Sequence, residues 1–359
     1  MNVCAVIAEY NPLHHGHLTH IARIRALLGT DTGLVAIMSG NVVQRGEFPI
    51  LEKTVRTRMA LAAGFDLVFE LPAPYACAPA EKFARGAVDI AANLGVVTHL
   101  SFGAETADLD ALRELSERSV GELPKDVPMA AALPELFPDA AALFTPNNIL
   151  ALEYLRALKG TGITPLPVAR EGSVHDGPGS ASEIRKRVLA GSVPKTTPFY
   201  SLWREEERAG RAPITLLKQE GAVLSRLRRM SMMDFLVLPD VGAGGLAQRL
   251  YRAAVGARSL PELYRLAKTK RYTLARIRRC VLAAFLSLPE TPPPPHIRLL
   301  GLGKRGPELL SRVNSPVISR PAAHRGQLAL EAAITDQLAL CMPYPETAGG
   351  EWRKGVVKG

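Results

Sequence analysis

Hydrophobic and polar positions follow two different periods in the first half of the chain. Apolar positions three and four residues apart, as at Leu18, Ile21, Ile24 and Leu28, predict an amphipathic helix. Short continuous apolar runs that stop at a turn residue are instead typical of buried strands. We predict strands over residues 3–8, 34–38, 67–71, 98–102 and 164–170, and helices over residues 16–28, 54–63, 80–94, 147–158 and 182–189. Strands that alternate with helices indicate an α/β fold with a doubly wound parallel sheet.

The pattern changes near residue 200. Long helical periods rich in Leu, Ala and Arg follow, with few strand signals, and the tract TPPPP at residues 291–295 predicts a stiff spacer. Residues 120–146, rich in Pro and Ala, are expected to leave the sheet, and residues 171–180 to form a mobile Gly/Ser-rich loop. Two prolines within 164–170 place that strand at an edge. We predict a first domain over 1–199, a mostly helical domain over 200–320 and a C-terminal extension over 321–359.

Composition is that of a soluble globular protein, with 47% hydrophobic and 22% charged residues. No apolar run approaches the roughly 20 residues that a membrane span needs, so we expect no membrane partner. The N-terminal sequence has no pattern of a secretory signal. Cys4, Cys77, Cys280 and Cys341 stand singly, which favours packing roles over zinc sites or disulfides and suits the cytoplasm.

Positive charge is concentrated in one part of the chain. The net charge is +10, and residues 200–320 hold 22 Lys/Arg against 9 Asp/Glu. A localised basic surface is the expected footprint of a polyanion, with nucleic acid the first candidate. The alternative is a solvated basic face with no partner.

The sharpest local motif is the tetrad His14-His15-Gly16-His17, an H-x-G-H between a predicted strand and a predicted helix. Ligands of an open α/β sheet bind beyond the carboxyl ends of the strands, where a helix N-terminus offers free N–H groups to phosphate. Gly16 lets the backbone approach closely. We predict that His14 and His17 donate hydrogen bonds to the α-phosphate of a nucleotide as charge develops on it. The alternative is a histidine-rich surface or metal-scavenging turn.

Two further blocks fit the same end of the sheet. The run Ser180 to Arg185 places a hydroxyl and an arginine near a helix start, and we predict that Ser182 and Arg185 clamp the β- and γ-phosphates. Ser182 could equally be an ordinary N-cap. Polar and cationic side chains after the second strand could receive a carboxylate substrate, or could form a solvated loop and a basic helix face. These candidate acid-binding residues are Ser39, Asn41, Gln44, Arg45 and Lys53.

A fourth block lies in the basic segment. Basic residues surround an aromatic residue there, a combination that suits phosphate contacts and base stacking. The alternative is an exposed basic helix. The candidate tRNA-binding residues in this block are Lys268, Lys270, Arg271, Tyr272, Arg276 and Arg279.

Taken in order, the runs AEYNPLHHGHLTHI, MSGNVVQRGE, FELP, FARGAVD, LSFGAE, NNILALEY, SASEIRK and KTKRYTLARIRR resemble the tRNA(Met) cytidine acetate ligase family of the HxGH nucleotidyltransferase superfamily. The resemblance extends to about residue 320. It implies a Rossmann-like ATP and acetate domain followed by a tRNA-binding domain. It also implies activation of acetate by ATP as acetyl-adenylate and transfer of the acetyl group to the wobble cytidine of elongator tRNA(Met). Mg²⁺ is expected as a counter-ion on the nucleotide, without a dedicated protein metal site.

By the same resemblance, the nucleotide contacts are Ile7, Ala8, Glu9, Tyr10, Asn11, Pro12, Leu13, His14, His15, Gly16, His17, Leu18, Thr19, His20, Gly103, Asn147 or its neighbour Asn148, and Arg170. Two other functions stay open at this point. One is a small-molecule adenylyltransferase or acid–amine ligase of the same superfamily. The other is a tRNA-binding protein whose catalytic site has lapsed.

Overall fold

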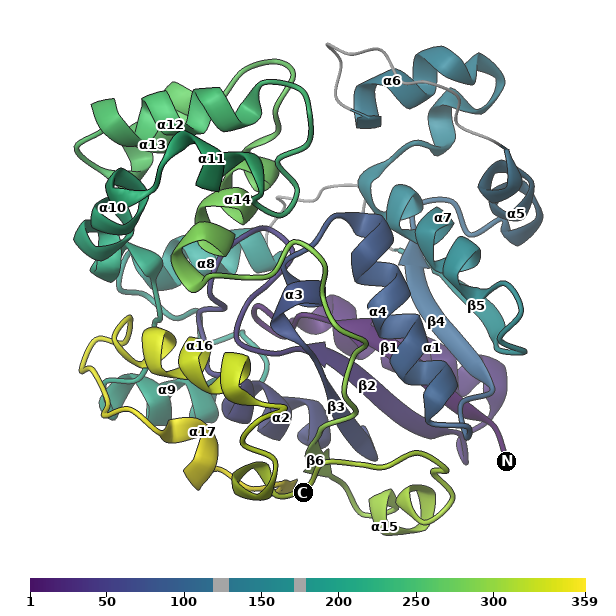
Figure 1. Ribbon diagram of the computed structural model, residues 1–359. Helices are drawn as coiled ribbons and strands as arrows, with labels where there is room; N and C mark the ends of the chain where they lie inside the picture. Colours follow the sequence, from purple (N-terminus) through teal and green to yellow (C-terminus); the bar gives the residue numbers. More distant parts are fainter. Residues whose placement is uncertain (119–128, 171–178) are drawn as a thin grey trace.

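One seven-stranded sheet organises the molecule, in the order β5-β4-β1-β2-β3-β6-β7 (Figure 1). It is seen in a computed structural model that describes residues 1–118, 129–170 and 179–359. The first five strands are parallel, as predicted. They are β1 (Val3–Ala8), β2 (Gly33–Ser39), β3 (Leu67–Leu71), β4 (His99–Ala104) and β5 (Thr164–Ala169).

The sheet is covered on both faces, which is why its central strands are continuous apolar runs. Every residue of β2 and β3 is buried. Successive side chains alternate between two cores, with Val35 and Ile37 in one and Leu34 and Ala36 in the other. The fold is therefore doubly wound, as predicted. β5, with its two prolines, lies at the sheet edge, where a missing N–H costs no ladder bond.

Different helices supply the two cores. One core contains side chains of α1 (His15–Leu28), α2 (Lys53–Ala62) and α8 (Ala181–Leu189). The other contains side chains of α3 (Ala73–Ala76), α4 (Ala80–Asn93) and α7 (Pro146–Leu158). The short helices α5 (Leu109–Glu117), α6 (Met129–Leu136) and η1 (Pro138–Leu143) lie between β4 and α7 in the chain. Of the loop expected over residues 171–180, residues 171–178 lie outside the described part.

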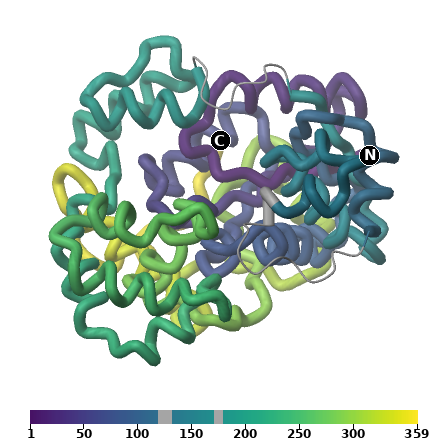
Figure 2. Tube along the Cα trace, turned by 90° about the horizontal axis from the view of Figure 1, so that it is seen from above, coloured from purple at the N-terminus to yellow at the C-terminus, as the bar shows by residue number. Residues whose placement is uncertain are grey.

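Helices dominate after residue 200, as the sequence predicts. They are α9 (Tyr200–Arg208), η2 (Leu216–Gln219), α10 (Glu220–Arg229), α11 (Met232–Leu236), α12 (Leu246–Gly256), α13 (Leu260–Ala267) and α14 (Leu274–Leu286). Helices α10 to α14 gather in one bundle (Figure 1). In Figure 2 this green segment lies to one side of the purple and blue N-terminal part of the chain.

The end of the chain returns to the sheet, which the sequence did not lead us to expect. β6 (Leu299–Leu302) pairs antiparallel with β3, and β7 (Val357–Lys358) pairs with β6. The five parallel strands of the predicted doubly wound sheet are thus extended at one edge by an antiparallel strand, so the whole sheet is mixed. Between these strands lie α15 (Gly306–Leu310), η3 (Pro321–Ala323), α16 (Ala329–Ala339) and α17 (Gly350–Arg353). The division at residues 199 and 320 stays a prediction, and β6 joins the sheet of the first range from within the second.

Candidate functional site

The turn from β1 into α1 is held by its own histidines. His14 is the N-cap of α1, and its Nδ1 accepts a hydrogen bond from the Gly16 N–H at 3.1 Å. The His14 N–H in turn donates to Nδ1 of His17 at 3.1 Å. The two rings lie 3.9 Å apart between centroids. The motif therefore forms a capping box in which imidazoles replace the usual hydroxyl and carboxylate.

These bonds determine the tautomer of both rings. A ring nitrogen that accepts a backbone N–H cannot bear a proton in the neutral imidazole, so the proton of His14 and of His17 is on Nε2. Burial, followed by the charges of Arg170, His15 and Arg185, lowers the pKa of His14 to about 4. Burial and the His14 ring lower the pKa of His17 well below its usual range. At neutral pH the pair presents two uncharged Nε2–H donors.

The rest of the stretch 7–20 surrounds this pair. Ala8, Tyr10, Asn11, Pro12 and Leu13 are buried, Ile7, Glu9, His14, His17, Leu18 and His20 are half-buried, and His15, Gly16 and Thr19 are exposed. Tyr10 has a left-handed backbone (φ 47°) that non-glycine residues seldom adopt, and its ring packs edge-on against His17 at 5.0 Å. Tyr10 and Leu13 belong to the core, so only their backbone groups are available to a nucleotide.

Ser182 and Arg185 lie against this turn, although they are far from it in the chain. Arg185 Nη1 donates to the Asn11 carbonyl oxygen at 2.6 Å, and its Nη2 donates to Ser182 Oγ at 3.2 Å. The N-cap of α8 is Ser180, whose Oγ accepts from the Glu183 N–H. The alternative reading of Ser182 as the N-cap is therefore wrong, and its hydroxyl faces Arg185 instead.

The other nucleotide candidates meet at the ends of β4 and β5. Arg170 Nη1 donates to Asn147 Oδ1 at 3.1 Å, and a Cβ on Gly103 would lie 3.2 Å from the Arg170 side chain. Asn148 is fully buried, and its Oδ1 accepts from the Glu105 N–H at 3.0 Å. Of the two asparagines, Asn147 therefore faces Arg170, and Asn148 holds the loop after β4.

His20 extends the histidine cluster along α1. Its Nε2 lies 2.8 Å from Ser101 Oγ on β4. Burial, then the charges of Arg170 and Arg23, lowers the pKa of His20 to about 4. The charge of Arg170, after burial, lowers the pKa of His14 and His17 as well.

Two of the five acid-binding candidates, Gln44 and Arg45, are not buried. Arg45 is exposed and Gln44 is half-buried, and the Gln44 N–H donates to Glu9 Oε1 at 2.7 Å. Ser39 and Asn41 are fully buried, and Asn41 Nδ2 donates to Thr335 Oγ1 of α16 at 2.7 Å. Both side chains are therefore closed to solvent, Asn41 by its contact with α16, and their contact with an acid stays a prediction.

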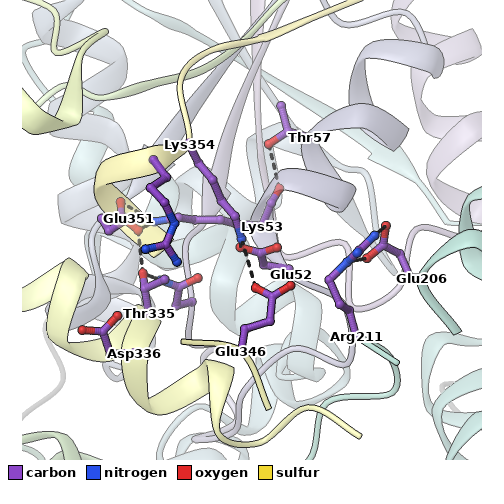
Figure 3. A network of polar contacts seen from close by, with 12 residues as sticks. Glu52, Lys53, Thr57, Glu206, Arg211, Thr335, Asp336, Glu346, Glu351 and Lys354 are labelled. Atoms are coloured by element: carbon purple, nitrogen blue, oxygen red, sulfur yellow. Dashed lines mark hydrogen bonds and ion pairs between the residues drawn. The ribbon is translucent and has the colours of Figure 1, made fainter. Parts of the chain in front are cut away.

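The predicted contact of Lys53 with an acid substrate is corrected, because its ammonium group is buried in ion pairs within the protein. Its Nζ forms buried ion pairs with Glu70 of β3 at 2.7 Å and with Glu351 of α17 at 2.9 Å. Arg298 pairs with the same two carboxylates. Figure 3 shows this region, where α16 and α17 bring polar side chains against Glu52 and Lys53. Lys53 therefore joins the C-terminal segment to the sheet.

Arg56, a cationic residue just beyond the acid-binding candidates, has a structural role beneath the site. Its guanidinium is fully buried and donates at 2.8 Å to the carbonyl oxygens of both Glu9 and Ser39. It therefore joins the ends of β1 and β2 beneath the site. A single arginine on a helical period has no local signal of such a role.

The basic block around Tyr272 divides into two groups. Lys268 and Lys270 are exposed. The Tyr272 ring is only 5% exposed, and its hydroxyl donates to the Gly244 carbonyl, so it cannot stack on a base in this conformation. The expected stacking role is corrected. Arg271 lies over the Tyr272 ring, with its guanidinium carbon 5.4 Å from the centroid.

Two of the three arginines of α14, Arg276 and Arg279, belong to this block and make structural contacts. Arg276 Nε donates to the Asp240 carbonyl at 2.8 Å. Arg279 pairs with the Asp240 carboxylate at 2.7 Å and donates to the Gln44 carbonyl at 3.1 Å. A nearby hollow of about 630 Å³ adds two basic residues that the sequence analysis did not name, Arg249 and Arg252.

Within the described residues, no group of three or more His, Cys, Asp or Glu side chains converges on a metal position. In that same part of the chain, no helix has the length and apolarity to cross a bilayer.

The four cysteines are buried and free, which confirms their packing roles.

Comparison with known proteins adds to this geometry. A family model described as HIGH Nucleotidyl Transferase matches residues 1–349. The chain is 34% identical to the tRNA(Met) cytidine acetate ligase of Thermoanaerobacter sp. (strain X514), over 92% of this chain and 91% of that protein. It is 32% identical to the protein of that name from Acetivibrio thermocellus, over 99% and 100% of the two chains. The fold is similar to that of Thermotoga maritima TmcAL bound with alpha-thio ATP, with a TM-score of 0.88, 27% sequence identity and 100% coverage of both chains.

Proposed function

The chain belongs to the tRNA(Met) cytidine acetate ligases of the HIGH nucleotidyltransferase family, and we propose that its paired imidazoles activate acetate on ATP for transfer to that tRNA. The observation that supports this most directly is that Nδ1 of His14 and Nδ1 of His17 each accept a hydrogen bond from a backbone N–H. Both rings offer a neutral Nε2–H donor at the N-terminus of α1. A helix N-terminus beyond a parallel strand suits a nucleotide phosphate.

In the first step, an acetate oxygen attacks the α-phosphorus of ATP. A new O–P bond forms, the bond to the bridging oxygen of the β-phosphate breaks, and pyrophosphate leaves. His14 and His17 donate to the α-phosphate oxygens as negative charge builds there. Arg185 and Ser182 bind the β- and γ-phosphates. Exposed Arg45 attracts the acetate carboxylate.

In the second step, the exocyclic amine of the wobble cytidine attacks the acetyl carbon. The amide C–N bond forms, the C–O bond to phosphate breaks, AMP leaves, and the amine loses a proton. Exposed Lys268 and Lys270, with Arg249 and Arg252 of the adjoining hollow, bind the phosphate backbone of elongator tRNA(Met). Mg²⁺ enters with the triphosphate, whose oxygens are the hard ligands that it prefers. We propose that both steps take place in the cytoplasm, where the tRNA is found.

Two assays with the purified protein test this function. The first is acetate-dependent exchange of labelled pyrophosphate into ATP, and the second is mass spectrometry of nucleosides from treated tRNA. We expect both exchange and acetylcytidine. Full turnover on a small amine without tRNA would instead indicate a small-molecule ligase. Tight tRNA binding with neither exchange nor acetylation would indicate a protein whose catalytic site has lapsed.

A further inference from the structure

A cavity of about 640 Å³ lies where the sheet meets the helical bundle. The loop after β2 lines it with Arg45 and Glu47, and α8 lines it with Arg185. The helical bundle contributes Tyr264 of α13 and Arg278 of α14. Its volume is within the usual range for a small-molecule site.

The cavity adjoins the nucleotide site. Arg185 lines it while donating to the Asn11 carbonyl of the H-x-G-H turn. Arg45 directly follows Gln44, whose N–H donates to Oε1 of Glu9 at 2.7 Å, and Glu9 directly follows β1. A group bound in the cavity therefore lies near the carboxyl end of β1, where the proposed acetyl-adenylate forms.

The two sides of the cavity are joined by contacts between the loop after β2 and helix α14. Gly46 has φ +74°, and a Cβ there would lie 2.3 Å from the Arg279 backbone nitrogen, so the loop and α14 touch backbone to backbone. The Glu47 carboxylate is paired with Arg278. Arg279 also donates to the Gln44 carbonyl. The side chain of Glu47 is thus positioned by α14.

The lining is complementary to a cytosine nucleotide. Tyr264 offers an aromatic ring, with the Arg278 guanidinium carbon 5.4 Å from its centroid, and such surfaces stack on unpaired bases. A carboxylate accepts the hydrogen bond that the cytosine N4 amino group donates. Arg45 offers donors for the carbonyl oxygen O2 of the base or for a phosphate. A purely apolar lining would lack all of these partners.

We propose that this cavity receives the wobble cytidine, turned out of its loop, and that Glu47 is the catalytic residue that takes the proton from its N4 amine. This inference rests on the proposed function. The lone pair of N4 forms the bond to the acetyl carbon, the C–O bond to the phosphate of AMP breaks, and the N4 proton passes to a Glu47 carboxylate oxygen. Arg278 holds that carboxylate in place, and Tyr264 stacks on the base.

The test compares the two steps in Glu47→Gln, which retains an acceptor but is a poor base. We measure pyrophosphate exchange without tRNA, and the single-turnover rate of acetyl transfer after mixing with tRNA. The ratio of transfer to exchange should fall about 10²-fold or more, the usual contribution of a general base. Glu290→Gln, an exposed carboxylate elsewhere, is the control and should match the parent.

Tyr264→Ala gives a second, independent test should Glu47→Gln fold poorly. It should raise the KM for tRNA about tenfold, the loss expected for one stacked base, with a smaller effect on the KM for ATP. Equal losses of exchange and transfer in Glu47→Gln, or an unchanged KM for tRNA in Tyr264→Ala, would overturn the assignment. Failure of the proposed function itself is distinguishable, because the parent protein would then show neither exchange nor acetylation.

Discussion

The backbone N–H of His14 donates to Nδ1 of His17 at 3.1 Å, and the Nδ1 of His14 accepts from the Gly16 N–H. This local geometry leaves the Nε2–H of each ring as a donor. Because burial also lowers the pKa of both rings, the donors remain uncharged at neutral pH. The proposed phosphate binding at this turn relies on these oriented dipoles in addition to the arginines nearby.

Replacing His14 with Asn separates its role as the N-cap of α1 from its proposed role as a hydrogen-bond donor to the nucleotide. An asparagine side chain is a good N-cap, so His14→Asn should keep the stability of the parent within about 1 kcal/mol. It removes the Nε2–H donor, so the turnover of acetate-dependent pyrophosphate exchange should fall about 10²-fold. His324→Ala, outside the site, serves as control. An exchange rate equal to that of the control would show that the His14 ring only caps the helix.

Arg185 should act mainly on ATP binding. Arg185→Ala removes the donor to the Asn11 carbonyl and the partner of Ser182, and a charge-assisted hydrogen bond contributes about 1.5–3 kcal/mol. The KM for ATP in the exchange assay should therefore rise about tenfold or more. Arg187→Ala is the matched control on the same helix, since Arg187 is exposed and pairs only on the surface with Glu183. Similar KM values for the two variants would contradict a phosphate-binding role for Arg185.

The buried histidines should make stability depend on pH. His20 has an unfolded pKa near 6.5 and a folded pKa of about 4, so between these values the unfolded chain binds the extra proton. The stabilisation is present above pH 6.5 and is lost as the pH falls toward 4. In His20→Leu, the free energy of unfolding from urea titrations should therefore fall less between pH 7 and pH 4.5 than in the parent.

Above pH 7 the profiles of the two proteins should run parallel, which gives an internal control. Glu331, whose pKa burial raises to about 7, acts in the opposite direction and destabilises the fold as the pH rises from 4.5 to 7. It is common to both proteins and cancels in their difference. Identical slopes below pH 6.5 would show that His20 is not held neutral by the fold.

The buried ion pairs of Lys53 should contribute far more to the free energy of unfolding than ion pairs on the surface. Lys53→Met leaves the buried carboxylates of Glu70 and Glu351 without one cation, and breaking a buried pair typically costs about 3–5 kcal/mol. Lys159→Met is the control, because Lys159 and Glu117 are both largely exposed and 3.9 Å apart. Its free energy of unfolding should change by less than about 1 kcal/mol. Equal effects in the two variants would mean that Lys53 does not join the C-terminal segment to the sheet.

Much of the fold is predictable because local pattern and burial coincide in the central sheet. The strand predicted over 67–71 and the helix predicted over 80–94 match β3 and α4, since β3 is apolar except for Glu70 and α4 has a strong helical period. The turn at residues 14–17 was likewise predictable, because its chemistry is contained in four consecutive residues.

Contacts between residues far apart in the chain explain where the predictions from the sequence were wrong. Lys53 and Asn41 were expected at an open surface, yet residues almost 300 positions later bury them, as the 298-residue separation of Lys53 and Glu351 illustrates. β6 has only four residues and follows a proline tract, which is too short a run to stand out as a strand. Tyr272 was expected to be exposed because its neighbours are charged, but the Gly244 carbonyl holds its hydroxyl.

A crystal structure of this chain with alpha-thio ATP tests the central claim most directly. We expect Nε2 of His14 and of His17 within about 2.7–3.1 Å of α-phosphate oxygens, as donors to developing charge require. A nucleotide bound away from the β1–α1 turn, or rings turned so that Nδ1 faces the phosphate, would contradict it.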